Sequence, residues 1–409
     1  MGLAVFLVTW VFLSGFKIPG LKLDRTGAAF VGAAAMVVLG VVPPAEIARA
    51  IDLDTLVLLL GMMVLAAYLT RAAFFRASAW YVLRAARSPK GLLLALVGIS
   101  GLLSAFLVND TVCLMLTPLV LVLVKSADLP PLPYLLGLCM ASNAGSVATF
   151  TGNPQNMIIG VTSQLGYGRF LLFMALPALL SLAIVYGVIV WRFRAQLGPR
   201  AIHPDGPRPP VDRRLLGLCT LVMLGVLVAF FVGLPMSWSA FVGAAVVMAL
   251  SGVSPEEELK RVDYGLLLFF GCLFIVVSGV NREGWADAMR SLFAPLMAGG
   301  PLRETFGFTA LTVVASNLFS NVPYVMLARA WIPSLEQPEL GWQVLALAST
   351  LAGNLTLIGS VANLIVFEGA KDTVKVTFWQ YLRVGLPATV LSLVVGLGVL
   401  LAERAIVAP

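Results

Sequence analysis

The polar stretch ASNAGSVATFTGNPQN at residues 141–156 interrupts a long apolar run, and ASTLAGNLTLIGSVAN at residues 348–363 interrupts another. Small and polar residues recur in register in the two stretches: Ala141/Ala348, Ser142/Ser349, Thr149/Thr356, Gly152/Gly359 and Asn156/Asn363. Glycine permits backbone conformations that other residues resist, and a proline suits the first turn of a new helix. The pattern therefore predicts two helices that are broken midway, over residues 134–163 and 343–367.

The composition places these helices in lipid. The chain has 409 residues, of which 60% are hydrophobic and only 11% are charged, and its mean hydropathy is +0.97. An ordinary soluble domain carries about 25% charged residues. A soluble chain of this length would form two or three domains with polar surfaces, and this chain has too few charged residues to cover them. We therefore expect a multi-pass protein of the plasma (inner) membrane, in contact with the lipid bilayer.

Two further blocks repeat in the same order, about 210 residues apart. GMMVLAAYLTRAAFF from Gly61 matches GCLFIVVSGVNREGW from Gly271, and SAFLVNDTVCLML from Ser104 matches SNLFSNVPYVML from Ser316. Three blocks in one order indicate an internal duplication, which is common in transporter folds.

The second of these blocks lies in an apolar run, 91–124, that is interrupted only by Asn109-Asp110. As one helix this run would be about 51 Å long, too long for a hydrocarbon core of about 30 Å. As two helices, its second limb of about 14 residues would reach only about 21 Å. We therefore expect a re-entrant hairpin with the Asn-Asp pair at its tip, and a second hairpin over 305–332 with its break at Asn321-Val322-Pro323.

The remaining apolar runs are predicted to be simple spans: 3–16, 26–42, 53–70, 170–192, 215–233, 236–252, 264–280 and 385–402. Because the hairpins add no net crossing, each half has five spans, and this odd number gives the two halves opposite orientations. The predicted fold class is an all-α polytopic membrane protein with an inverted repeat, an architecture of many secondary transporters. The first repeat is 1–192, a cytoplasmic linker is 193–214, and the second, inverted repeat is 215–409.

Basic residues predict the orientation. With the 192–214 loop inside, the inside loops hold 20 Lys and Arg and the outside loops hold 6, whereas acidic residues divide 10 to 9. This bias agrees with the positive-inside rule and places both termini outside. Arg25 is counted among the inside loops, and Asp52, Asp54 and Asp263 at span ends are interpreted as interfacial. The formal net charge of +7 then reflects the membrane topology. The basic residues form no clustered stripe of the kind that binds nucleic acid.

Asp110 is the only ionisable residue in its apolar run, and it is our candidate for the coupling group. A charge at membrane depth is costly and is tolerated where it lines a polar cavity. The alternative is that the hairpin tip reaches the interface, where Asp110 would only cap the helix that starts at Thr111. The candidate substrate- and ion-binding residues lie at the hairpin tips and helix breaks: Asn109, Asp110, Thr111, Asn143, Thr149, Thr151, Gly152, Asn153, Asn156, Ser320, Asn321, Asn354, Thr356, Gly359, Ser360 and Asn363.

The residue types in this set suit two kinds of ligand. The amino end of a half-helix presents free N–H groups and a positive dipole end, which attract an anion. Freed carbonyl groups and Asn or Thr oxygens, together with Asp110, could instead hold Na⁺ at the hairpin tips or take up a proton. Polar packing between helices is the alternative for any single Thr or Ser of the set.

The inventory argues against an enzyme, a bound cofactor or a transition-metal site. The four cysteines (Cys113, Cys139, Cys219 and Cys272) lie in apolar runs without ligand spacing, and the single histidine, His203, lies in the polar linker. One deep carboxylate is too few for an aspartic dyad. No GxxxxGK[ST] loop is present, so an ATPase could act only as a separate subunit.

At these blocks the chain resembles the ion transporter superfamily, which includes arsenite efflux permeases, citrate permeases, divalent-anion/sodium symporters and one group of sodium/proton antiporters. VNDTVCLMLTP at 108–118, SNVP at 320–323 and TGNPQN at 151–156 are similar to motifs of the arsenite-permease branch and its uncharacterised anion-permease relatives. The dicarboxylate/sodium symporters carry Ser-Asn-Thr at the hairpin tips, where this chain has Val108-Asn109-Asp110 and Ser320-Asn321-Val322. The resemblance implies a scaffold domain and a transport domain, a midplane site, alternating access and, often, a homodimer.

The sequence thus predicts a secondary active transporter that moves arsenite or a related small anion or oxyanion, coupled to a proton or sodium gradient. Two alternatives from the same superfamily stay open: a sodium/proton antiporter, and a sodium-coupled dicarboxylate, citrate or sulfate symporter. From a different class, a channel could also carry re-entrant hairpins.

Overall fold

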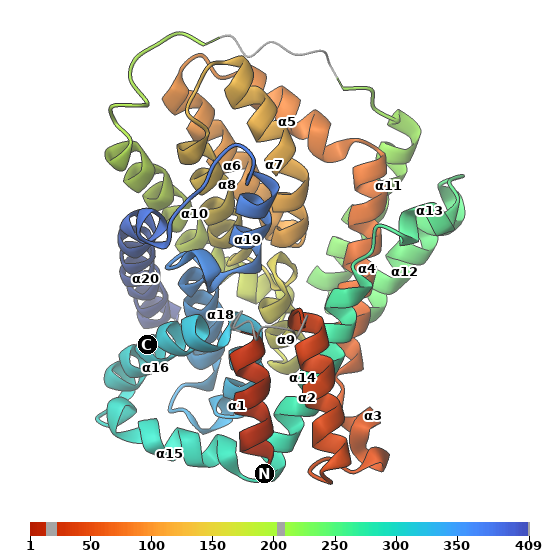
Figure 1. Cartoon of the computed structure of the whole chain (residues 1–409), viewed down its shortest axis with the longest axis vertical. Coiled ribbons are helices and arrows are strands. Elements are labelled where there is room, and N and C mark those ends of the chain that lie inside the picture. The colour runs from red at the N-terminus through yellow and green to blue at the C-terminus, as the bar shows by residue number, and fades with distance from the viewer. Residues whose placement is uncertain (14–22, 203–208, 408–409) are drawn as a thin grey trace.

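A computed structural model of the chain describes residues 1–13, 23–202 and 209–407 (Figure 1). The helices before the linker are α1 Gly2–Leu13, α2 Arg25–Val38, α3 Ile47–Ala50, α4 Leu53–Arg71, α5 Phe74–Arg84, α6 Pro89–Phe106, α7 Asn109–Ser126, α8 Pro131–Ser146, α9 Pro154–Thr162 and α10 Tyr167–Arg192. The helices after it are α11 Arg213–Phe231, α12 Met236–Leu250, α13 Pro255–Leu259, α14 Tyr264–Arg282, α15 Trp285–Met297, α16 Pro301–Phe319, α17 Asn321–Ala328, α18 Pro338–Ala352, α19 Val361–Gly369 and α20 Phe378–Val407. Four short 3₁₀ turns are η1 Pro44–Glu46, η2 Phe150–Gly152, η3 Ile332–Ser334 and η4 Leu357–Gly359.

The prediction of an all-helical, polytopic chain is confirmed. Helices occupy all eight runs predicted as simple spans, and seven helices of the described chain are long and apolar enough to cross a membrane. Three more apolar helices, α1, α2 and α12, are shorter. Residues 14–16 of the first predicted span and residues 203–208 of the linker, with His203, lie outside the described residues.

The first hairpin breaks two residues earlier than predicted. Helix α6 ends at Phe106, Leu107 and Val108 form the turn, and Asn109 and Asp110 belong to the first turn of α7. An acidic side chain is favourable in the first turn of a helix because it faces the positive end of the dipole. Helix α7 therefore has 18 residues and a length of about 27 Å. The predicted length of about 14 residues for this limb was wrong, because the prediction treated Asn109 and Asp110 as a loop.

The second hairpin breaks at Ser320, whose φ of 68° lies in the left-handed region. A non-glycine residue held there is strained. Helix α17, which begins at the next residue, Asn321, has only 8 residues. The predicted break at Asn321 is therefore displaced by one residue.

Two stretches that we predicted to be loops contain amphipathic helices. Helix α5 follows α4, and helix α15 follows α14. In Figure 1, α5 lies at the top of the molecule and α15 at the bottom, both across the ends of the long helices. A search for continuous apolar runs misses such helices, since their apolar residues occupy only one side.

The helices form two packed groups. Helix α4 packs on α12 and α2 packs on α14, whereas α6 packs on α8 and α10 packs on α20. Figure 1 shows α4, α11, α12 and α14 to the right of α6, α8, α10 and α20. The groups meet where α9 and α7 contact α4, and where α17 contacts α14. This boundary contains the site described below.

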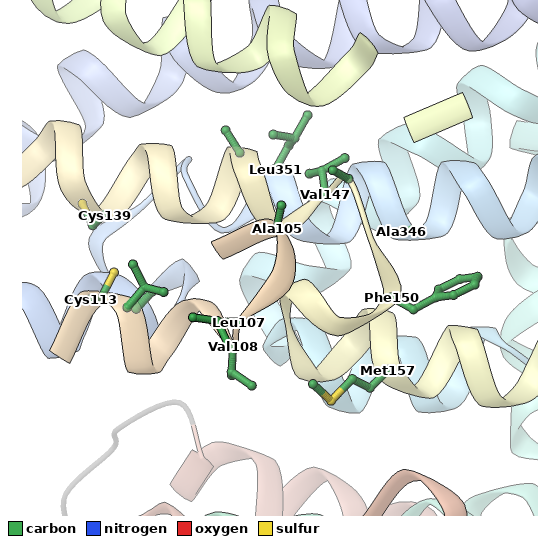
Figure 2. Packing of buried hydrophobic residues seen from close by; sticks show 14 of the residues in the cluster. Ala105, Leu107, Val108, Cys113, Cys139, Val147, Phe150, Met157, Ala346 and Leu351 are labelled. Carbon is green, nitrogen blue, oxygen red and sulfur yellow. The ribbon is translucent and has the colours of Figure 1, made fainter. Parts of the chain in front are cut away.

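Apolar side chains fill the space around the helix breaks. Figure 2 shows, within one buried cluster, Ala105, Leu107, Val108, Val147, Phe150, Ala346 and Leu351. Helices α6 and α8 approach very closely here, because a Cβ atom placed on Gly145 would lie 2.1 Å from the carbonyl oxygen of Gly101. Small residues at a helix contact let backbones approach in membranes.

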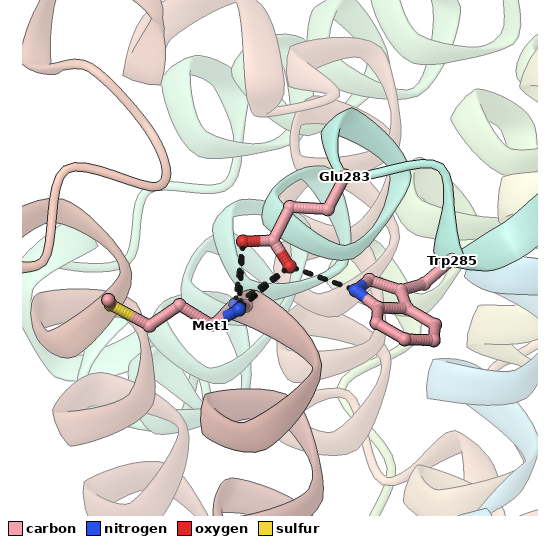
Figure 3. Close-up of polar contacts among 4 residues, drawn as sticks. Met1, Glu283 and Trp285 are labelled. Carbon is pink, nitrogen blue, oxygen red and sulfur yellow. Dashed lines mark hydrogen bonds and ion pairs between the residues drawn. The ribbon is translucent and has the colours of Figure 1, made fainter.

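The first helix is fixed to the end of α14 by a carboxylate. Glu283 accepts hydrogen bonds from the Gly2 N–H and from Trp285 Nε1, each at 2.9 Å (Figure 3). The Gly2 N–H is the main cause that holds the pKa of Glu283 at about 2, below its ordinary value of 4.5. This lowered pKa means that the contact stabilises the fold above pH 4.5 and that the stabilisation is lost as the pH falls toward 2.

We expect Gly145→Ala to lower the free energy of unfolding by about 1 to 3 kcal/mol, because the added methyl group would force α6 and α8 apart. Thermal unfolding in detergent measures this effect. Gly98→Ala in α6 is the matched control, since a Cβ there has no neighbour within 4 Å. Equal stability of the two variants would contradict the close packing.

Candidate functional site

Six helices begin at one central cavity of about 180 Å³. Residues at the amino ends of these helices line it: Arg25 and Thr26 of α2, Asn109 and Asp110 of α7, Pro154 and Gln155 of α9, Asp263 before α14, Ser320 and Asn321 at α17, and Ser360 and Val361 at α19. Each amino end presents unsatisfied N–H groups and the positive end of a helix dipole. The cavity is therefore suited to a small ligand that is rich in oxygen or negatively charged.

Three charged residues line this cavity, namely Arg25, Asp110 and Asp263. The carboxylate of Asp263 already caps α14, because its Oδ1 accepts the Leu266 N–H at 2.9 Å. Asp110 and Arg25 come from different groups of helices, α7 and α2. The cavity thus combines one cation with one acid that is free of a capping role.

At this cavity, two buried amide oxygens have no hydrogen-bond partner among the described residues. They are Oδ1 of Asn109, which is 3% exposed, and Oδ1 of Asn321, which is 8% exposed. The orientation of the Asn109 amide is fixed by its Nδ2, which donates to Asn143 Oδ1 at 3.0 Å. A buried acceptor without a donor is costly. Ligand hydroxyl groups or a sodium ion would provide partners for these oxygens.

Asn143 of α8 lies at the centre of a buried amide network. Its Nδ2 donates to Asn354 Oδ1 at 2.9 Å and to Asn363 Oδ1 at 3.1 Å. Its Oδ1 accepts from Asn109 Nδ2 at 3.0 Å and from Ser360 Oγ at 3.0 Å. Residues predicted from both repeats are thereby brought into direct contact.

The first helix break is held together by side-chain amides. Asn156 Nδ2 donates to the carbonyl oxygens of Ser146 at 3.1 Å and Thr149 at 3.0 Å. Asn153 caps α9 by accepting the Asn156 N–H at 2.9 Å. Gly152 is required at the turn, because a Cβ there would lie 2.3 Å from the Ser146 oxygen. These contacts supply partners for backbone groups that a broken helix leaves free.

The second break repeats this geometry. Asn363 Nδ2 donates to the carbonyl oxygens of Gly353 at 2.7 Å and Thr356 at 3.1 Å, which are the counterparts of the two acceptors in the first break. Thr356 also donates to Asn317 Oδ1 at 3.0 Å, and Gly359 ends a 3₁₀ turn as Gly152 does. The repeat found in the sequence is therefore also a repeat of hydrogen bonds.

The predicted site residues fall into three groups. The central cavity is lined by Asn109, Asp110, Ser320, Asn321, Gly359 and Ser360. Buried contacts beside it hold Asn143, Thr149, Thr151, Gly152, Asn153, Asn156, Asn354, Thr356 and Asn363. Thr111 belongs to neither of these groups and instead lines a second cavity.

The second cavity, of about 350 Å³, continues the first, since Asp110, Asp263, Leu266 and Val361 line both. It extends to Thr70 at the end of α4, next to α5 at the top of Figure 1. Asp110 therefore lines both cavities.

At the opposite end, an arginine holds the two helix groups together. Arg329 Nη1, after the end of α17, lies 3.2 Å from Asp52 Oδ2 and donates to Thr162 Oγ1 at 3.3 Å. Asp52 caps α4, and Thr162 ends α9. The far ends of two half-helices that begin at the central cavity are thus fastened to α4.

Sequence reasoning missed Arg25, Thr26 and Asp263 as lining residues of the cavity. Arg25 was counted as a loop charge and Asp263 as interfacial, and the structure places both among the residues that line the cavity. The reason is that α2 and α14 begin at the cavity. The available signal was an Asp cap before each helix, at Asp24 and Asp263, which marks a helix start without indicating its depth.

We expect Asn143→Ala to lower the free energy of unfolding by about 3 kcal/mol, because it removes four hydrogen bonds and leaves buried amides unpaired. Asn281→Ala, at an exposed asparagine near the end of α14, is the matched control. Thermal unfolding in detergent compares the two. A loss no larger than that of the control would show that the network does not hold the site together.

We expect Arg329→Gln to open the end of the molecule near α15. A Gln155→Cys reporter in a cysteine-free background should react about threefold faster with an impermeant thiol reagent from that side. Arg169→Gln is the control, since Arg169 pairs with Glu339 at 2.8 Å at the same end without involving α4. Equal labelling rates for both variants would exclude a closing role for Arg329.

Two solved transporters share this fold. The Alcanivorax borkumensis YdaH transporter aligns with a TM-score of 0.58 over 98% of this chain and 96% of its own, and Neisseria gonorrhoeae MtrF aligns with a TM-score of 0.59 over 98% and 93%. Each is 14% identical to this chain, so the likeness concerns the fold alone. The chain therefore has the fold of these two proteins.

The sequence relatives are more specific. A family model described as citrate transporter matches residues 4–352, and the chain belongs to this citrate transporter family. The silicon efflux transporter LSI3 of Oryza sativa subsp. japonica is 32% identical, over 97% of this chain and 96% of its own length. A Dictyostelium discoideum protein carrying the name transporter arsB is 26% identical over 96% and 90%. The chain is thus a membrane transporter that is similar to both.

Proposed function

We propose that this chain is a secondary active transporter of a small anion or oxyanion of the arsenite type, driven by a proton or sodium gradient. The observation that carries the proposal is the cavity where six helices begin and which Asp110 lines. The helix amino ends offer N–H donors to ligand oxygens, and the unpaired Oδ1 atoms of Asn109 and Asn321 accept from ligand hydroxyl groups. The names of the family and its relatives refer to citrate and to silicon efflux.

Asp110 is the coupling group in this proposal. It is an acid at membrane depth, and such residues mark ion and proton pathways. It stands beside the unpaired oxygens of Asn109 and Asn321 at one cavity, so a proton or a sodium ion bound there would change the charge that the substrate meets. Substrate and coupling ion would thereby share one site.

The proposed architecture is an inverted repeat of 1–192 and 215–409, joined by a cytoplasmic linker over 193–214. The supporting observation is the matching pattern of hydrogen bonds in the two breaks. The second cavity, which reaches the end of α4, then leads to the cytoplasm. Movement of one helix group along the other would expose the central cavity to the other side.

Sodium/proton exchange is the second candidate. It is favoured by the same two unpaired amide oxygens, since oxygen atoms together with a carboxylate are suitable ligands for Na⁺. Sodium flux driven by a pH gradient in the absence of any transported anion would favour this candidate over the first.

The test is reconstitution in proteoliposomes with imposed pH or sodium gradients, supplying arsenite, sulfate, citrate and succinate in turn. We expect Asp110→Asn to lower gradient-driven transport of the accepted substrate about tenfold or more, because the coupling charge is removed. Asp287→Asn, at an exposed aspartate of α15, is the matched control. Unchanged gradient-driven transport by Asp110→Asn would refute its coupling role, and a wild-type protein that moves none of these substrates would refute the proposed function.

A further inference from the structure

Arg25 is the one basic residue among the residues that line the central cavity. We infer that Arg25 of α2 and Asp110 of α7 act as one charge pair across this cavity, and that Arg25 determines which ligand charge the cavity accepts. The second part of this inference rests on the proposed function, whereas the first part does not.

Arg25 has no alternative carboxylate beside it. Its neighbour Asp24 is engaged as the cap of α2, where Oδ1 accepts the Gly27 N–H at 2.7 Å. Among the residues that the structure describes, no acidic oxygen forms an ion pair with Arg25 within 4.0 Å. The guanidinium group keeps its charge at all relevant pH values, so this half-buried cation needs a counter-charge. The cavity supplies it.

Of the two acids that line the cavity, Asp110 is the one available to Arg25. Asp263 is held against the amino end of α14, where it accepts the Leu266 N–H and faces the positive dipole end. In the part of the chain that the structure describes, Asp110 has no such capping contact and lines the same cavity as Arg25. The two charged groups form no ion pair within 4.0 Å, and both line the cavity of about 180 Å³.

The pair joins the two helix groups. Arg25 lies on α2, which packs on α14, and Thr26 Oγ1 donates to the Gly265 carbonyl oxygen at 3.4 Å. Asp110 lies on α7, which packs on α8 and α19. The positive charge of Arg25 on one helix group therefore balances the negative charge of Asp110 on the other, across the surface where the two groups meet.

This arrangement has a consequence for the ligand. With Arg25 present, the cation offsets one of the two carboxylates that line the cavity, and the helix amino ends can hold a negatively charged ligand. Without Arg25, two carboxylates face the cavity and repel an anion. An uncharged ligand would be affected far less, because it has no net charge to be repelled. Arg25 is thus a specificity-determining residue, and Lys would replace its charge without its two-pronged geometry.

The pairing is tested without any substrate, by thermal unfolding of Arg25→Gln, Asp110→Asn and the double variant in detergent. Each single change leaves one charge unpaired and should lower the midpoint by about 3 °C or more. The double variant should lose no more than the worse single variant, because both charges are gone. Additive losses would overturn the pair. If Arg25→Gln does not fold, Arg25→Met, Asp110→Asn and their double variant provide the same cycle, because methionine also removes the charge.

The specificity role is tested in proteoliposomes that carry the wild-type substrate. For a charged substrate, Arg25→Gln should raise KM about tenfold or more with a maximal rate within about threefold of wild type, and Arg25→Lys should recover most of the affinity. Lys90→Gln, at an exposed basic residue of α6, is the matched control. An unchanged KM for Arg25→Gln would overturn the specificity role. A wild type that transports nothing would instead contradict the proposed function, while the unfolding cycle would still decide the pairing.

Discussion

A helix that stops within a membrane must find partners for the backbone groups it leaves free, since lipid provides none. In this protein the partner is an asparagine placed after each break. The amide of Asn156 bonds two carbonyl groups of the first break, and the amide of Asn363 bonds the two equivalent groups of the second. These four hydrogen bonds allow α9 and α19 to begin in the interior. The central cavity depends on them, because it is formed by helix amino ends at that depth.

The same constraint explains the polar composition of the site. Asn143 joins Asn109, Asn354, Asn363 and Ser360, so the network is shared between both repeats and leaves few amide atoms unpaired. The atoms that do stay unpaired at the cavity, Oδ1 of Asn109 and of Asn321, are acceptors. Unpaired acceptors that are held in place by such a network pre-organise the cavity for a ligand, which then meets fixed dipoles instead of mobile ones.

Much of the fold could be predicted because a membrane limits the choices. Helices occupy all eight runs predicted as simple spans, since only helices satisfy the backbone of such runs. The errors have a common origin in treating polarity as a sign of a loop. Asn109 and Asp110 begin α7 instead of ending a hairpin limb, and the amphipathic helices α5 and α15 were taken as loops. A polar residue is compatible with a helix wherever one side of that helix is polar.

The sequence by itself determined the duplicated polar blocks and the helical class, and it predicted six of the residues that line the cavity. Matched positions such as Thr149 and Thr356 are found by comparing the two halves of the sequence. Burial in lipid then limits the roles that polar residues at these positions can have. Only the tertiary structure decided which charges meet. Depth in the membrane depends on how helices pack, so Arg25 and Asp263 resembled surface charges in the sequence and yet line the cavity of Asp110. Charges from α2, α7 and α14 converge there because two helix groups pack against each other, and no local pattern records that contact.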